Sequence, residues 1–145
     1  MCLSHLSAWL AGLWAGMLLC IALIAAPAPF ATLASADAGR VVARIFAQEA
    51  YASLAFAVVL FPLVRRQARV AAAAGTGSVV SANLLLVLGT LFCTVAGSFA
   101  VQPMIEAARA GQGAFSFGAL HAASMALFAL KALLVLILAW RLAGR

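Results

Sequence analysis

A bundle of four membrane-spanning helices, that is, an all-α integral membrane protein, is the fold class that this sequence predicts. Of its 145 residues, 68% are hydrophobic and only 8% are charged, whereas soluble domains are about half apolar and about a quarter charged. The apolar residues also fall into four runs, each close to the roughly 20 residues that a helix needs to cross a bilayer. We therefore expect a single transmembrane domain that covers residues 1–145.

The first predicted span covers about residues 6–26 and ends where Pro27 and Pro29 remove backbone donors. The short sequence "ASA" at 34–36 resembles a signal-peptidase cleavage site, so a cleavable signal peptide is the alternative. No Lys or Arg precedes Arg40, however, and the apolar run is longer than a signal-peptide core. We therefore expect the first helix to stay in the mature protein.

The remaining predicted spans cover about residues 45–64, 79–101 and 117–140. Asp37 is a suitable N-cap for a helix that begins before the second span. The glycine-containing segments "AAAAGTGSVV" and "ARAGQGAFSFG" separate the later spans, because glycine disfavours a continuing helix.

The basic residues predict the orientation of the chain in the membrane. With four spans, one side carries five of them and the other side carries three: Arg65, Arg66, Arg69, Arg141 and Arg145 against Arg40, Arg44 and Arg109. The positive-inside rule then places both termini in the cytoplasm. The net charge of +6 thus indicates contact with the lipid bilayer rather than with nucleic acid, and the alanine- and arginine-rich composition favours a bacterial-type inner membrane.

Small residues at helical spacing predict where helices approach each other. Gly12 and Gly16 form a GxxxG pattern in the first span, and the third span has small residues that include Gly89, Cys93 and Gly97. Both patterns are compatible with a dimer face, but we expect them to pack inside one bundle.

Several short stretches share their order and spacing with a known family. They are the turn with Pro27, Phe30 and Leu33, the proline of "QPMIEAARA" (Pro103), and the start of the last span with Leu120, His121 and Ser124. On these residues the chain resembles the transmembrane protein 205-like family, also described as domain of unknown function 4149. The resemblance implies a four-helix membrane protein without an assigned activity, and Lys131 departs from the family pattern.

Polar side chains gather at one predicted level near the outer ends of the helices. They are Gln48 and Glu49 in the second span, Gln102 and Glu106 at the end of the third, and His121 and Ser124 in the fourth. Because ionisable groups in membranes usually face the bundle interior, they suggest a hydrogen-bonded vestibule that responds to protons or cations. The alternative is a purely structural clasp between helix ends.

Lys131 lies deeper, and by span counting no acidic residue shares its depth, so we do not expect an ion pair within one protomer. Its ammonium can reach the headgroups by snorkelling, or bond the carbonyl of Val58, which Pro62 leaves without its helical donor. Both interpretations are structural and predict that Lys131→Leu preserves function and slightly stabilises the fold. A charge in a transport pathway is the competing hypothesis.

A metal or cofactor site has weak support in the sequence. Cys20, Cys93 and Met125 share a predicted depth, and thiolate and thioether ligands suit Cu(I). Without a CxxC-like motif, these residue types more often fill gaps in packing. His5 and His121 lie at opposite ends and cannot clamp one haem, so we expect no cofactor.

The sequence contains no recognisable catalytic set, so we expect a non-enzymatic protein. The preferred hypothesis is a small membrane protein that handles or senses a small solute or cation, with a homo-oligomer expected if it transports. The alternative is a scaffold or assembly subunit without a ligand.

Overall fold

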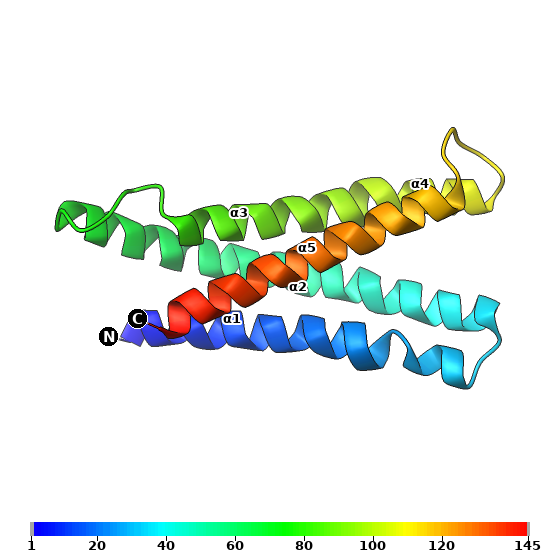
Figure 1. Cartoon of the computed structure of the whole chain (residues 1–145), viewed down its shortest axis with the longest axis horizontal. Coiled ribbons are helices and arrows are strands. Elements are labelled where there is room, and N and C mark those ends of the chain that lie inside the picture. Colours follow the sequence, from blue (N-terminus) through cyan, green and yellow to red (C-terminus); the bar gives the residue numbers. More distant parts are fainter. Residues whose placement is uncertain (1, 145) are drawn as a thin grey trace.

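The computed structural model describes residues 2–144, and within them it is helical without any strand. Four stretches are long and apolar enough to cross a membrane: Leu3–Ala31, Ser35–Ala73, Ala82–Arg109 and Phe117–Ala143. They run alternately up and down, so both chain ends and residues 74–81 lie at one end of the bundle, here the terminal end (Figure 1). Residues 32–34 and 110–116 form the opposite, distal end. The predicted all-helical fold with four spans is confirmed.

The four spans are built from five α-helices and three short helical segments of other types. They are α1 (Cys2–Cys20), the π-helix η1 (Ile21–Ala25), the 3-10 helix η2 (Ala28–Ala31), α2 (Ser35–Ala73), α3 (Ala82–Val95), the π-helix η3 (Ala96–Val101), α4 (Gln102–Arg109) and α5 (Phe117–Ala143). Ser81 and Ser116 cap α3 and α5, since their hydroxyls accept bonds from backbone N–H groups in the first turn.

Helix α2 is much longer than the predicted span of 45–64. Its 39 residues correspond to about 58 Å at 1.5 Å per residue, nearly twice the roughly 30 Å hydrocarbon core. The helix follows Ala34 with no side-chain cap, so the prediction that Asp37 is the N-cap is wrong. Asp37 instead lies in the first turn and forms an ion pair with Arg40.

The two π-helical turns each end two residues before a proline. The N–H of Ala26 bonds to the carbonyl of Ile21 ahead of Pro27, and the N–H of Gln102 bonds to that of Gly97 ahead of Pro103. A proline offers no donor, and its ring crowds the carbonyl four residues earlier, which favours a widened turn. Both widened turns lie in the distal half of the bundle.

The helices pack as a ring in which α1 and α3 each contact both α2 and α5. Helices α2 and α5 therefore occupy opposite corners, and their backbones are not in direct contact along the described residues. An apolar core fills the terminal half between the helices. Its fully buried side chains include Trp14, Leu18, Leu60, Val135 and Leu138.

The small residues of α1 and α3 play different roles. A Cβ added at Gly89 would lie 3.1 Å from Leu134 Cδ1 of α5, so α3 and α5 approach closely there, as predicted. A Cβ added at Gly12 or Gly16 would meet nothing within 4 Å. The prediction that this GxxxG pattern packs inside the bundle is therefore wrong, and both glycines lie on the outer face of α1.

Candidate functional site

A cavity of about 410 Å³ lies between α2 and α5 in the distal half of the bundle. It exists because these two helices lie at opposite corners of the ring and leave a space between them. Segments η1, η2, η3 and α4 complete its wall, so both π-helical turns border it. π-Helical turns are often found at functional sites because they shift side chains out of helical register. The volume lies within the roughly 300–1,000 Å³ of small-molecule sites.

The floor of the cavity is an ion pair between Glu49 of α2 and Lys131 of α5. Lys131 Nζ lies 2.8 Å from each carboxylate oxygen of Glu49, and the two side chains are only 1% and 4% exposed. The same ammonium lies over the ring of Phe128, with 5.1 Å between Nζ and the ring centre. Phe128 also contacts Phe46 of α2 edge-on, at 5.1 Å between ring centres. The Glu49–Lys131 ion pair and the Phe46–Phe128 ring contact thus connect α2 and α5, whose backbones do not pack together.

The carboxylate of Glu49 is held from its other side by a chain of hydrogen bonds. The Ser53 hydroxyl donates to Glu49 Oε1, and Trp14 Nε1 donates to Ser53 Oγ at 2.9 Å. Ser53 and Trp14 are fully buried. We call Trp14, Ser53, Glu49 and Lys131 the polar relay; it joins α1, α2 and α5 in one line. Every buried side-chain polar atom among the described residues has a partner, as a low-dielectric interior requires.

The sequence-based interpretation of Lys131 is therefore wrong. Lys131 is 3% exposed and bonds to Glu49, so it neither snorkels nor reaches Val58, whose side chain is 68% exposed on α2. Pro62 lies within α2 without ending it. The error came from the predicted start of the second span at residue 45, which put Glu49 one turn inside the membrane. Since α2 starts at Ser35, Glu49 lies 14 residues into its helix, as Lys131 does in α5.

The predicted vestibule residues are brought together only in part. Gln102, His121 and Ser124 line the same cavity as Glu49, but Gln48 and Glu106 do not and are exposed. Among the described residues, His121 makes no hydrogen bond to the others. It is exposed, and its ring stacks on Phe117 at 5.7 Å. The predicted hydrogen-bonded network is thus replaced by separate polar groups around a cavity.

The three residues considered as a soft-metal set do not converge. Cys93 and Met125 line the cavity, whereas Cys20 lies on the outer face of α1 in a shallow groove beside Gly16. Sequence reasoning missed Trp14, Ser53, Phe46 and Phe128. Of these four, only Ser53 could have been found from the sequence, because it lies four residues after Glu49 and therefore on the same face of α2.

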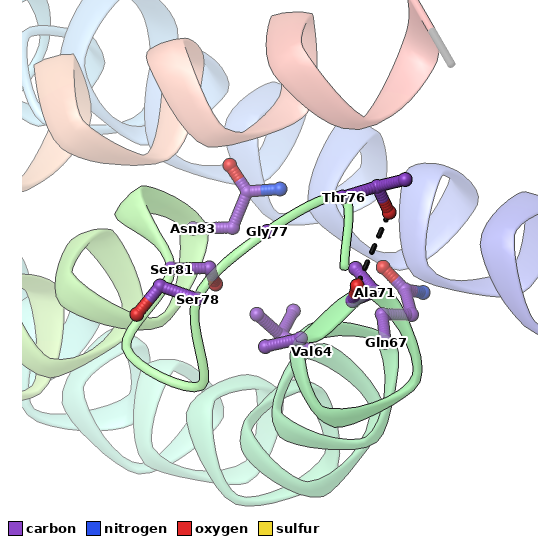
Figure 2. A pocket seen from close by; sticks show the side chains of 9 residues that line it. Val64, Gln67, Ala71, Thr76, Gly77, Ser78, Ser81 and Asn83 are labelled. Carbon is purple, nitrogen blue, oxygen red and sulfur yellow. Dashed lines mark hydrogen bonds between the residues drawn. The ribbon is translucent and has the colours of Figure 1, made fainter. Parts of the chain in front are cut away.

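A second, smaller cavity of about 100 Å³ lies at the terminal end, under residues 74–81. The Thr76 hydroxyl donates to the carbonyl of Ala71 at 3.1 Å, beside Gln67 (Figure 2). Among the described residues, no charged side chain lines this cavity, and Asn83 accepts a bond from Arg141 at 2.8 Å. Its size suits a few waters at about 30 Å³ each, so the distal cavity is the stronger candidate site.

Comparison with known proteins adds a family but no activity. The family model described as "Domain of unknown function (DUF4149)" matches residues 9–114, which covers most of the four-helix bundle up to the end of α4. The match carries no transmembrane protein 205-like label and does not reach His121 or Lys131. No curated protein and no solved structure matches the chain. With a family match across most of its length, this four-helix membrane protein belongs to the DUF4149 family.

Proposed function

We propose that the protein binds a small amphiphilic solute, without catalysis, in its distal cavity. The observation that carries this proposal is the form of the cavity. Exposed Phe30, Arg109 and His121 lie at its mouth, and the Glu49–Lys131 pair lies at its floor. Side chains between the two ends are mainly apolar, and they include Val42, Phe46, Met125 and Phe128. A molecule with polar and apolar parts fits such a lining.

The cavity ends blindly within the bundle. On the terminal side of the ion pair, the core side chains Leu60, Val135 and Leu138 are fully buried. This arrangement favours binding or sensing over a continuous channel, and transport would require a second conformation or a second copy. By the positive-inside rule, the distal end would face outward from a bacterial-type inner membrane, with both termini in the cytoplasm.

The Glu49–Lys131 ion pair favours a solute that is not a cation. A buried carboxylate binds a cation only when its charge is available, and both oxygens of Glu49 already contact Lys131. A scaffold without a ligand is the competing hypothesis, and it predicts no saturable occupation of the cavity.

Two native cysteines provide the test. Cys93 lines the cavity, while Cys20 is exposed on the outer face of α1. The protein in nanodiscs would be alkylated with N-ethylmaleimide in the presence of amphiphiles with different head groups, and each site would be followed by peptide mass spectrometry. We expect at least one amphiphile to slow Cys93 saturably and leave Cys20 unchanged.

A pair of variants sharpens this test. Ala129→Trp would fill the cavity and should itself slow the alkylation of Cys93, whereas Ala126→Trp, three residues earlier on α5 and outside the cavity, should not. An unreactive Cys93 in the free protein, or equal protection of both cysteines, would refute an accessible binding cavity and favour the scaffold.

A further inference from the structure

The side chains that line the distal cavity carry more positive than negative charge. Lys131 Nζ contacts both oxygens of Glu49, and Ser53 donates to one of them, so the one acidic side chain that lines the cavity is neutralised. Arg109 and His121 remain as the other basic lining residues. The cavity therefore carries a net positive charge, and an incoming cation finds no free carboxylate.

The basic groups at the mouth are held in place by an aromatic ring. The guanidinium of Arg109, at the end of α4, lies 5.2 Å from the ring centre of Phe117. The imidazole of His121 stacks on the same ring at 5.7 Å, with 10° between the planes. Among the described residues, Arg109 has no acidic partner. A guanidinium ordered in this way is suited to two parallel hydrogen bonds with a carboxylate, sulfonate or phosphate group.

Glu106, the acidic residue of α4, does not neutralise the positive charge of Arg109 in the cavity. Glu106 precedes Arg109 by three residues, but it is exposed, does not line the cavity and forms no ion pair within the described residues. It therefore provides a matched control for Arg109.

The space below the mouth suits an alkyl chain. From His121 at the mouth to Lys131 at the floor there are ten residues of α5, or about 15 Å along the helix. Phe46, Met125 and Phe128 lie along this wall. A chain in this position would run parallel to the lipid tails, with its head group at the level of the distal helix ends.

We propose that the solute is an anionic amphiphile, with its head group between Arg109 and His121 and its tail directed towards Phe128. This inference rests on the proposed function and adds the charge of the ligand and the residues that recognise it. The anion can be a single-chain solute or a phospholipid of the bilayer, because both share this chemistry.

The experiment compares three probes with the same tail: decanesulfonate, decanol and decyltrimethylammonium. The two ionic probes are added below their micelle concentrations, and decanol below its solubility limit, to the protein in nanodiscs of zwitterionic lipid. The alkylation of Cys93 is measured against that of Cys20. We expect decanesulfonate to protect Cys93 at a concentration about tenfold below that of the other probes, a difference typical of one charge-assisted contact. Arg109→Gln should abolish this advantage, and Glu106→Gln should leave it intact.

The outcomes separate the two proposals. Equal protection by all three probes would overturn the anionic preference and leave a binding cavity, while no protection by any probe would overturn both. If Glu106→Gln raised the advantage of decanesulfonate about as much as Arg109→Gln lowered it, the preference would come from general surface charge and the site would be refuted. Protection by anionic phospholipid in the disc, without any probe, would support the anion and identify the bilayer as its source.

Discussion

Lys131 and Glu49 are bonded across the diagonal of the bundle: the ammonium lies 2.8 Å from both carboxylate oxygens, although the backbones of α5 and α2 do not pack together. The pair thus fixes the separation of two helices that enclose the cavity. In the low dielectric of the membrane interior, each charge is tolerated only because the other is present.

The first prediction concerns removal of one charge. Lys131→Met should destabilise the protein by about 3–5 kcal/mol, because it leaves a buried carboxylate without a counter-charge. This reverses the sequence-based expectation for Lys131→Leu. In the double variant Glu49→Gln/Lys131→Met, most of the loss should be recovered, since a neutral amide can still accept the Ser53 bond. Unfolding in mixed micelles measures the stability of both variants. A Lys131→Met variant as stable as the native protein would contradict the ion pair.

The second prediction concerns the middle of the polar relay. Ser53→Ala removes the acceptor for Trp14 Nε1, which is fully buried, and should cost about 1–3 kcal/mol. Trp14→Phe combined with Ser53→Ala should cost less than the sum of the two single variants, because both remove the same bond. Strict additivity in this double-mutant cycle would show that the two side chains are not coupled.

The third prediction separates two glycines that look alike in the sequence. Gly12→Ala should be neutral or stabilise by about 0.5–1 kcal/mol, since the site is open and alanine favours a helix. Gly89→Ala should destabilise by about 1–3 kcal/mol, because its methyl group would press on Leu134. Unfolding measurements check both. A loss of stability in Gly12→Ala, together with a change in oligomer size, would instead indicate a contact between protomers.

The fourth prediction concerns sidedness. In a chain with its native cysteines changed to serine, Gln112→Cys at the distal end should react with a membrane-impermeant maleimide added to intact cells. Ser78→Cys, at the terminal end, should react only after the membrane is opened. Both positions are exposed. The reverse pattern would invert the orientation derived from the positive-inside rule.

The sequence was sufficient to predict the number and order of the helices, because long apolar runs leave few other options in a membrane. It failed on depth. A helix starting before the second span was predicted, with Asp37 as its N-cap, but depth was counted from the span start at residue 45, whereas α2 begins at Ser35. Counting from residue 45 hid the common depth of Glu49 and Lys131.

The orientation of the glycines was beyond the sequence for another reason. The lipid tails and the interior of a helix bundle are equally apolar, so hydropathy does not show which face of a span packs against other helices. Gly12 and Gly89 have the same spacing pattern around them and lie in opposite environments. The cavity was also not predictable, since it results from two diagonal helices and from turns widened before Pro27 and Pro103.

The polar relay also has a consequence for how the chain is made. Lys131 follows Glu49 by 82 residues, so α2 is synthesised and enters the bilayer well before its counter-charge exists. During that interval Ser53, which accepts a bond from Trp14, is the already translated group that donates to the carboxylate. When α5 is synthesised, Lys131 alone would oppose its insertion by about 2.5–3.5 kcal/mol. An ion pair with Glu49, which is already in the membrane, offsets that cost. Glu49 of α2 thus favours the insertion of α5 into the membrane.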